Sequence, residues 1–453
     1  MHKDRIGIDE WVASYESRLA RGTGIREGVR RLVALLPEWL WLMLGLAAVL
    51  AVPMLSVNDY LLRVLGGIAL TIMLGTGLTL VTGYAGLLDL GYIAFYGLGA
   101  YGYAYLSSDF TGIHLPIFVS LPLIVLSCSL IGGLLGMVSL RLSGDYLAIA
   151  TLGFGLIFVQ FLLTFNRIWL PGLERPIDLT GGPNGIVRLD GLNIGIVQLD
   201  HLHVMYLVLV LAAVLLLTIL HRLNRSPVGR SWRALREDDL AAETMGIPTQ
   251  RLKLLAFALG AGVAGFAGAF FALWQGAVFP SSFDLAALIA LYSVIVLGGL
   301  GSLRGVVIGA MLMVALPEVL RQPALATLLF YSAGATLAFA LLKPRWLAIL
   351  PLAGMGITAW IIVALPLSDM LLTVGNFAFA GLIIVALGMM RTHSVRLRLG
   401  LLVLLLPLSV VAWHVRLLPE PGITRFILLG ALLIGMMVHR PDGLFGQKRV
   451  EVL

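Results

Sequence analysis

The chain has 453 residues, of which 59% are hydrophobic and only 12% are charged. A soluble domain carries about 25% charged and about 45–50% apolar residues, so this composition excludes an ordinary soluble domain and indicates a chain that lipid surrounds. The net charge is +7, which basic loops facing anionic lipid explain, and no segment has the pattern of a nucleic-acid site. The single cysteine, Cys128, excludes a disulfide framework.

The N-terminal residues 1–37 are predicted to form a cytoplasmic tail. They are polar, carry both signs of charge and lack the pattern of a cleaved signal peptide. Apolar residues between positions 8 and 19 recur at helical spacing. This spacing is consistent with a short amphipathic helix on the membrane surface, and equally with a solvated tail.

Fourteen apolar segments follow, each close to the roughly 20 residues that cross a bilayer. They lie near 38–56, 60–82, 91–107, 116–139, 146–165, 203–221, 251–274, 284–300, 305–320, 325–342, 346–367, 371–390, 399–415 and 422–438. The sequence therefore predicts an all-α polytopic membrane protein with about 14 transmembrane helices.

Loop charges predict the orientation of these helices. With the N-terminus inside, most loop arginines and lysines fall on one side, and the opposite loops hold chiefly aspartates. Positive charge accumulates on the cytoplasmic side of membrane proteins. We therefore expect a multi-pass protein of the bacterial inner (plasma) membrane with both termini in the cytoplasm.

The most basic loop, 222–250, is predicted to dock a partner. Its segment 230–245 is predicted to form one helix, with Trp232, Leu235, Leu240 and Met245 as apolar members. A simple connector has no use for an apolar face, because it has nothing to bury that face against. A helix lying on the lipid surface is the alternative.

Glycines gather in three places, namely 83–102, 181–185 and 298–309. Within a membrane, glycine lets helices approach closely or breaks a helix where the backbone lines a cavity. The dense run 83–91, which contains Asp89, favours a break beside a translocation path. The run 298–305 fits a tight cytoplasmic turn as well as it fits the wall of a path.

The sequence lacks the motifs of catalysis and of ion coupling. It has no phosphate-binding loop of the Gly-x-x-x-x-Gly-Lys type, no histidine pair at metal-ligand spacing and no nucleophile motif. The main ionisable residues expected at membrane depth are Asp89 and Glu318, which make a poor relay for protons or sodium. We expect no catalytic residue, metal or cofactor in this chain, and an energy source in another subunit.

Several short segments occur in a fixed order along about 40–320 and 421–446. They are 83–91 (GYAGLLDLG), 95–101 (FYGLGAY), 144–155 (GDYLAIATLGFG), 180–186 (TGGPNGI), 226–230 (SPVGR), 234–238 (ALRED), 246–247 (GI), 264–268 (AGFAG), 298–302 (GGLGS) and 440–446 (RPDGLFG). Together they resemble the LivM-type permeases of bacterial branched-chain amino acid ABC importers.

The resemblance implies that 226–250 is a coupling loop that inserts a helix into an ATPase subunit. The residues implied in coupling are Gly229, Arg230, Arg233, Arg236, Glu237, Asp238, Ala241, Ala242, Glu243 and Gly246. In the family pattern a Glu-Ala-Ala triplet precedes the glycine, whereas residues 240–242 here read Leu-Ala-Ala. Glu237 or Glu243 is the candidate to replace the missing glutamate.

The resemblance also implies a translocation path and its external gate. The residues implied are Gly83, Tyr84, Gly86, Asp89, Gly91, Gly97, Gly99, Thr180, Gly181, Gly182, Asn184, Gly298, Gly299 and Gly301. The Asp89 carboxylate is not a fixed feature of the family. Either it acts in transport, or it only breaks the helix.

The chain is longer than the resemblance requires. We expect a permease core at 38–320, an insert at 322–420 and a final span with the cytoplasmic C-terminus at 421–453. About ten spans are then family-like and about four belong to the insert. The insert is either a peripheral addition facing lipid or a module for a partner or for regulation.

The expected function is that of the transmembrane permease subunit of an ATP-driven importer for leucine, isoleucine and valine. The resemblance implies a homologous second permease (LivH-type), two ABC ATPase subunits (LivG/LivF-type) that bind ATP and Mg, and a periplasmic amino-acid-binding protein. The second permease could also be a copy of this chain. The alternatives are a permease of the same type for urea, amides or other amino acids, and a secondary transporter that works alone.

Overall fold

The computed structural model describes residues 47, 49–55, 58–139, 144–166, 178–192, 201–342, 345–364, 369–391, 395–419, 421–440 and 442–446. The predicted tail 1–37 and most of the predicted span 38–56 lie outside these residues. Residues Met1–Leu62 form one compact unit and Arg63–Leu453 another. The description below concerns the second unit, together with α4, which begins at Asp59.

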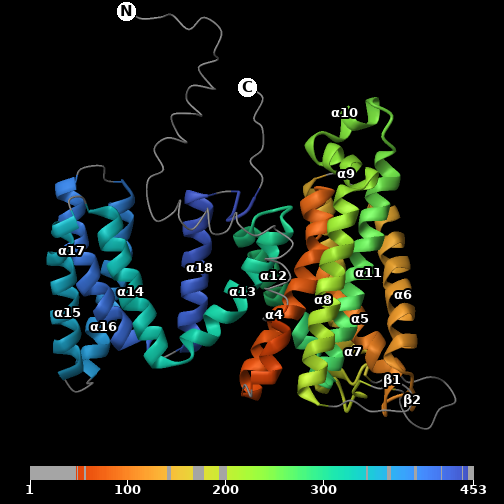
Figure 1. Ribbon diagram of the computed structural model, residues 1–453, viewed down its shortest axis with the longest axis horizontal. Helices are drawn as coiled ribbons and strands as arrows, with labels where there is room; N and C mark the ends of the chain where they lie inside the picture. The colour runs from red at the N-terminus through yellow and green to blue at the C-terminus, as the bar shows by residue number, and fades with distance from the viewer. Residues whose placement is uncertain are drawn as a thin grey trace, which may run out of the picture. The chain divides into compact units, whose positions relative to one another are not determined.

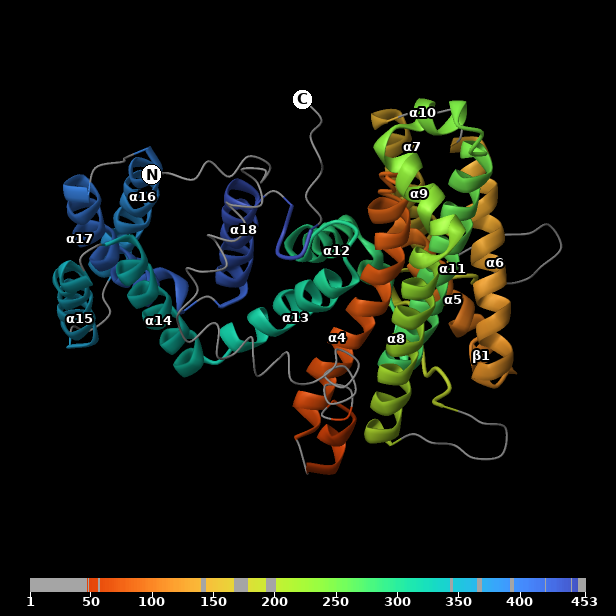
Figure 2. The same ribbon diagram turned by 45° about the horizontal axis from the view of Figure 1, so that its top comes forward.

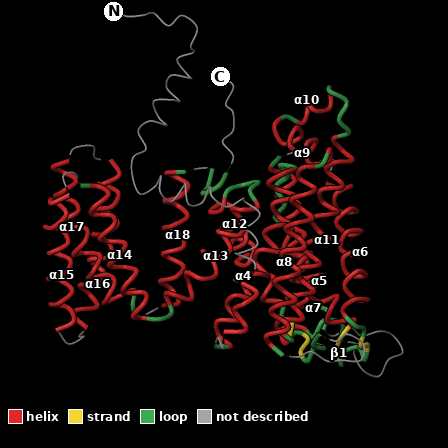
Figure 3. Tube along the Cα trace, in the orientation of Figure 1, coloured by secondary structure: helices red, strands yellow, loops and turns green. Residues whose placement is uncertain are grey.

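The described residues are predominantly helical, as Figures 1 and 3 show. The helices up to residue 320 are α4 (Asp59–Leu78), the π-helical η2 (Thr79–Tyr84), α5 (Tyr92–Leu106), α6 (Ile117–Ser139), α7 (Asp145–Thr164), α8 (Leu202–Arg225), α9 (Pro227–Glu237), α10 (Asp239–Thr244), α11 (Thr249–Gln275), α12 (Leu285–Gly298) and α13 (Leu303–Leu320). Four very short strands pair as β1 (Ser107–Ser108) with β2 (Ile113–His114) and β3 (Ile186–Val187) with β4 (Ala277–Val278). The prediction of an all-α membrane fold is confirmed.

Seven helices of the described part are long and apolar enough to cross a membrane. They are Asp59–Tyr84, Ile117–Met137, Asp145–Thr164, Leu202–Arg225, Thr249–Gln275, Pro280–Gly298 and Leu303–Leu320. Five shorter apolar helices follow residue 322, and the 15-residue α5 covers the predicted span 91–107. The total of about 14 spans stays a prediction.

Helix α11 lies against both α5 and α6, and glycine makes this close packing possible. A Cβ on Gly99 would collide with the carbonyl oxygen of Gly265, and one on Gly268 would collide with the carbonyl oxygen of Tyr96. Small residues at a crossing let two helix backbones approach and gain dispersion contacts, which is the main source of helix association in lipid. The buried motifs of α5 and α11 thus build the centre of the helix bundle.

The first helices after residue 322 form a group with an apolar centre of its own. The group consists of α14 (Pro323–Leu341), α15 (Ile349–Ala364), α16 (Asp369–Arg391) and α17 (Val395–Ala412). The π-helical η6 (Trp413–Leu417) and α18 (Pro421–His439) follow it, and α18 contacts α12 and α13. Figure 2 shows α14 to α17 grouped together. Their common cluster of buried residues includes Met355, Leu402 and Val410. Separate packing of this kind fits an inserted set of helices, and the predicted limits 322–420 stay a prediction.

The two ends of the main bundle differ. Helices α9 and α10 lie at one end of α5, α8 and α11, and the β1–β2 hairpin lies at the other (Figure 1). Both ends thus carry short connecting segments. The candidate sites are the α9–α10 segment at one end and a break in the helices within the bundle.

Candidate functional site

The predicted glycine-rich break is present between α4 and α5. The helix changes to the π-helical η2 at Thr79, ends at Tyr84, and the chain runs without helix to Gly91. Gly86 has a positive φ of 73°, a conformation that glycine adopts without strain. π-Helical turns are rare overall, and many of those that occur lie at functional sites.

Asp89 is buried inside this break and fixes its geometry. Its Oδ1 atom accepts a hydrogen bond from the backbone N–H of Gly91 at 2.9 Å. Its carbonyl oxygen accepts one from the Tyr292 hydroxyl at 2.7 Å, and the next N–H, that of Leu90, donates to Thr151 Oγ1 at 3.0 Å. Asp89 thus shapes the turn before α5, while a role in transport stays a prediction.

A cavity of about 550 Å³ adjoins the break. Its wall comes from the start of α5, from α7 and from the start of α12, and consists of Leu90, Ile93, Leu152, Gly155, Leu156, Ile157, Val159, Gln160, Phe283, Asp284, Leu285 and Leu288. Apolar side chains with a few polar groups are typical of sites for small molecules. The sequence analysis missed Gln160 and Asp284, although a glutamine within an apolar span is a signal for such a site.

The predicted path residues fall into separate places. Gly97 and Gly99 are at buried helix contacts of α5, against Phe158 and Gly265 respectively. Thr180, Gly181, Gly182 and Asn184 form a turn around η3 (Gly182–Asn184), which lies near α7 and near η4 (Pro280–Phe283). Since Phe283 of η4 lines the cavity, this turn lies close to the cavity wall, and its role as a gate stays a prediction.

The 298–302 segment is a tight turn between α12 and α13. Gly299 and Gly301 have positive φ values of 109° and 81°. The backbone N–H groups of Leu444 and Phe445 donate to the carbonyl oxygens of Leu297 and Gly298, at 3.0 and 2.9 Å. The C-terminal motif 440–446 therefore binds this turn, a long-range contact that the sequence analysis did not anticipate.

The basic loop forms two helices, so the prediction of a single helix over 230–245 is wrong. Asp238 leaves the helical conformation, with φ −156° and ψ 113°. Its Oδ1 atom accepts hydrogen bonds from the N–H groups of Leu240 and Ala241, at 2.9 and 3.0 Å. Aspartate is a strong N-cap residue, and here it ends α9 and begins α10.

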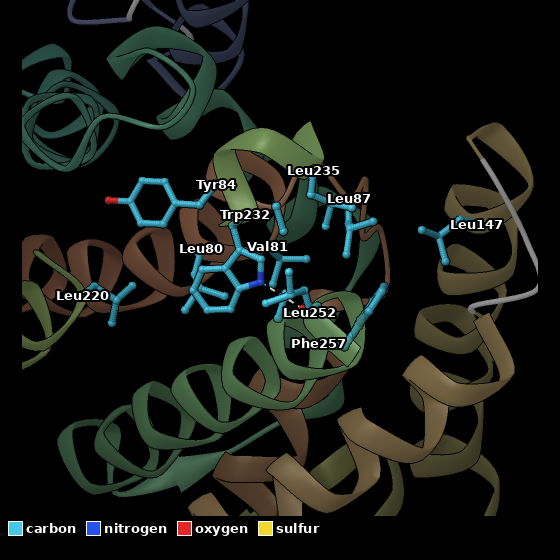
Figure 4. Packing of buried hydrophobic residues seen from close by; sticks show 12 residues of the cluster. Leu80, Val81, Tyr84, Leu87, Leu147, Leu220, Trp232, Leu235, Leu252 and Phe257 are labelled. Atoms are coloured by element: carbon cyan, nitrogen blue, oxygen red, sulfur yellow. Dashed lines mark hydrogen bonds between the residues drawn. The ribbon is translucent and has the colours of Figure 1, made fainter. Parts of the chain in front are cut away.

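The loop is packed firmly onto the bundle by α9. Trp232 is fully buried, and its indole N–H donates to the carbonyl oxygen of Leu252 at 2.9 Å. Figure 4 shows the indole surrounded by apolar side chains, among them Leu80 and Val81 of η2. The predicted apolar members Trp232 and Leu235 thus face inward and hold the loop in place.

The outer surface of the loop carries the remaining predicted residues. The side chains of Leu240 and Met245 are 76% and 83% exposed, which leaves two large apolar groups on the surface at α10. Exposed residues of the predicted coupling set are Arg230, Arg233, Glu237, Asp238, Ala241, Glu243 and Gly246, whereas Gly229 and Ala242 are buried. The loop thus has an inner face that anchors it and an outer face that is available to a partner.

Arg236 differs from the two exposed arginines of the predicted coupling set, Arg230 and Arg233, because its guanidinium points into the protein. Its Nη1 atom donates a hydrogen bond to the carbonyl oxygen of Gly83 at 2.6 Å. The contact joins the end of α9 to the end of η2, which are 153 residues apart in the chain.

Metal-ligating and acidic side chains are scattered among the residues that the structure describes. No group of three or more histidine, cysteine, aspartate and glutamate side chains there could hold a metal ion. Glu318, the other predicted intramembrane acid, lies near the end of α13 and pairs with Arg321 at 3.9 Å. It therefore stands apart from the break that contains Asp89.

Residues 60–342, more than half of the chain, match the family model "Branched-chain amino acid transport system / permease component". The match includes the break, the cavity wall and the coupling loop, and it continues through α14 into the segment predicted as an insert. No solved structure matches the chain.

Curated relatives give the same result. The chain is 40% identical over 251 residues to the high-affinity branched-chain amino acid transport system permease protein LivM of Escherichia coli, which covers 50% of this chain and 56% of that protein. It is 38% identical over 251 residues to LivM of Salmonella typhimurium, and 38% identical over 101 residues to the E. coli permease protein LivH, covering 22% of this chain and 32% of LivH. The chain thus spans about half the length of the LivM relatives that it matches. It belongs to the family of permease components of branched-chain amino acid transport systems.

Proposed function

We propose that this chain is the transmembrane permease subunit of an ATP-driven importer for the branched-chain amino acids leucine, isoleucine and valine. In this proposal the chain performs no covalent chemistry. Two ABC ATPase subunits bind ATP and Mg, a homologous second permease completes the path, and a periplasmic binding protein delivers the amino acid.

The observation that carries the proposal is the two-sided construction of the coupling loop. Trp232 anchors the loop inside the bundle, while Leu240 and Met245 stay exposed on α10. Exposed apolar residues surrounded by charged ones are typical of protein interaction sites. A transporter that works alone has no need for a rigid loop with such a surface.

The substrate is proposed from the relatives and from the cavity. The LivM and LivH relatives are named as permeases for branched-chain amino acids. The cavity wall is chiefly aliphatic, with Gln160 and Asp284 as polar groups, and its volume of about 550 Å³ has room for one small amino acid. Apolar lining of this kind suits an aliphatic side chain better than it suits urea.

The orientation is proposed from the charges of the loops. The coupling loop has to face the cytoplasm if ATPases bind it, and it is also the most basic loop of the chain. The β1–β2 hairpin at the other end of the bundle then faces the periplasm (Figure 1). Both termini are placed in the cytoplasm, in the bacterial inner membrane.

The test is co-purification with the neighbouring transport subunits. A tagged copy is co-expressed with the ATPases, the second permease and the binding protein encoded beside it, and the ratio of subunits is measured after gentle solubilisation. We expect two ATPase subunits and one second permease per copy of this chain. A chain that purifies alone and moves leucine into liposomes without ATP would overturn the proposal.

Two substitutions at the outer face make the test specific. Replacing Leu240 and Met245 together by serine removes the exposed apolar groups, and we expect recovery of the ATPases to fall about tenfold or more, as at interface hot spots. Val187→Ser is the matched control, because Val187 is an exposed apolar residue whose strand, β3, pairs with β4 just after the end of α11 that is remote from α9. ATPase recovery should be unchanged in this control.

A further inference from the structure

Arg236 lies where three segments that are distant in the sequence meet. It lies in the last turn of α9, its Nη1 atom donates a hydrogen bond to the Gly83 carbonyl of η2, and the same atom lies next to Gly301 in the turn between α12 and α13. A Cβ on Gly301 would lie 3.0 Å from Nη1 and 3.2 Å from the oxygen of Gly83. Gly83, Gly301 and the guanidinium of Arg236 are therefore in close mutual contact.

The stem of Arg236 also touches the break itself. A Cβ on Gly86 would lie 2.9 Å from Cγ of Arg236 and 3.2 Å from its Cα. Gly86 has φ 73°, which a residue with a side chain adopts only with strain. The backbone of the break at Gly86 therefore packs directly against the side chain of Arg236, with no room for a side chain at position 86.

The electrostatics of the contact explain why an arginine occupies this position. Gly83 lies in the last turn of the helical run α4–η2, where carbonyl groups lack partners within the helix. A positive charge at a helix C-terminus is also favoured by the helix dipole. A guanidinium supplies both the charge and a fixed fork of donors, and a charge-assisted hydrogen bond of this kind is stronger than a neutral one.

The remaining contacts of the three segments make the arrangement rigid. One helical turn before Arg236, Trp232 is buried and bonds α11. The turn that contains Gly301 is itself bound by the C-terminal motif, through the backbone N–H groups of Leu444 and Phe445. Arg236 is therefore held between a helix that is bound to α11 and a turn that is bound by the C-terminal motif.

We propose that Arg236 is a positioning residue that transmits movement of the coupling loop to the glycine-rich break at 83–91, by holding the Gly83 carbonyl against the turn at Gly301. This inference rests on the proposed function, and it gives Arg236 a role that differs from docking the ATPases. The outer face of the loop binds the partner, and Arg236 connects its inner face to the segment beside the cavity.

The experiment measures how much leucine is transported for each ATP hydrolysed. The complete importer, with ATPases, second permease and binding protein, is reconstituted in liposomes with radiolabelled leucine. Arg236→Met keeps the length of the stem that packs on Gly86 but removes the donor and the charge, and Arg236→Gln is a second neutral variant in case one of them does not fold. Arg251→Met is the matched control, because Arg251 is an exposed arginine at the start of α11.

We expect the neutral variants to retain the ATPases in the wild-type ratio and to hydrolyse ATP. Leucine transported per ATP should fall roughly tenfold, the factor that the loss of one charged hydrogen bond produces. Arg236→Lys keeps the charge and one donor, so it should recover part of the ratio, which a purely structural role would not require. The Arg251→Met control should match the wild type.

Three results would overturn the inference. The first is a wild-type ratio of leucine to ATP in a folded neutral variant, and the second is a lysine variant no better than the methionine variant. The third is loss of the ATPases from the neutral variants, which would assign Arg236 to docking. Failure of the wild-type chain to bind any ATPase is a different result, because it would overturn the proposed function itself.

Discussion

The indole N–H of Trp232 donates a hydrogen bond to the carbonyl oxygen of Leu252 at 2.9 Å, which ties α9 to the first turn of α11. The indole is fully buried, beside Val81 of η2 and Phe257 of α11. The coupling loop is therefore continuous with the core of the bundle. A force on the loop acts on helices that surround the glycine-rich break.

The first prediction concerns this anchor. Trp232→Phe removes one hydrogen bond, at a cost of about 1 kcal/mol, and Trp232→Ala also leaves a cavity, at a cost of about 3–5 kcal/mol. The midpoint of thermal unfolding in detergent should fall in the order wild type, phenylalanine variant, alanine variant, and protease should cleave the loop faster in the same order. Trp360→Phe is the control, because the Trp360 side chain is 75% exposed. Equal cleavage of the loop in all variants would contradict the anchoring role.

The second prediction concerns the crossing of α5 and α11. A Cβ on Gly99 would collide with the carbonyl oxygen of Gly265, so Gly99→Ala should separate the two helices and destabilise the protein by about 1–3 kcal/mol. Gly153 on α7 has no atom within 4 Å of the position of its Cβ. Gly153→Ala should therefore leave the thermal midpoint unchanged or raise it slightly, because alanine favours the helix by up to about 1 kcal/mol. The prediction fails if both variants unfold at the same temperature.

Features encoded locally were predictable from the sequence. Apolar length predicted the spanning helices, and the glycines around Asp89 predicted the break before α5. The charge and apolar spacing of the loop predicted a helix with Trp232 on its apolar face. The apolar spacing does not reveal the division of that helix, because the division depends on the Asp238 side chain acting as the N-cap of α10.

Contacts between distant segments were not predictable from the pattern. The sequence places Arg236 among several exposed arginines, and nothing local indicates that its guanidinium reaches Gly83. The contact of Phe445 with Gly298 likewise depends on how the chain returns after residue 420. The positive φ of Gly299 and Gly301 and the close contacts of their backbone, which the structure reveals, explain why glycines recur in that turn.

The third prediction concerns the loop at the end of the bundle opposite α9. Nδ1 of His114 lies 2.8 Å from Oδ2 of Asp190, and its Nε2 lies 3.7 Å from Asp109. The hydrogen bond and charge of Asp190, aided by Asp109, raise the pKa of His114 above its ordinary value of about 6.5. Because the pKa of His114 is raised in the folded protein, the ion pair stabilises the folded state fully below pH about 6.5. This stabilisation is lost as the pH rises through the pKa that His114 has in the folded protein.

The measurement compares the thermal midpoints of the wild type and of His114→Gln across a range of pH. The wild type should be the more stable at acidic pH, and the difference should shrink at alkaline pH. His201→Gln is the control, since His201 is an exposed histidine at the start of α8. A difference that grows with pH would have the wrong sign and would refute the proposed ion pair.

The fourth prediction concerns the binding of the C-terminal motif to the turn between α12 and α13. Gly443 has φ 77°, and a Cβ there would lie 2.5 Å from Cα of Gly299. Gly443→Ala should therefore displace the motif, because both the strained conformation and the collision act against the hydrogen bonds of Leu444 and Phe445. We expect a loss of about 1–3 kcal/mol, measured as a lower thermal midpoint, together with faster removal of the C-terminus by carboxypeptidase. Gly435→Ala on α18 has open space around its Cβ and serves as the control. If the C-terminus is equally protected in both variants, the motif does not depend on this contact, and the turn at Gly301 is held by its own backbone alone.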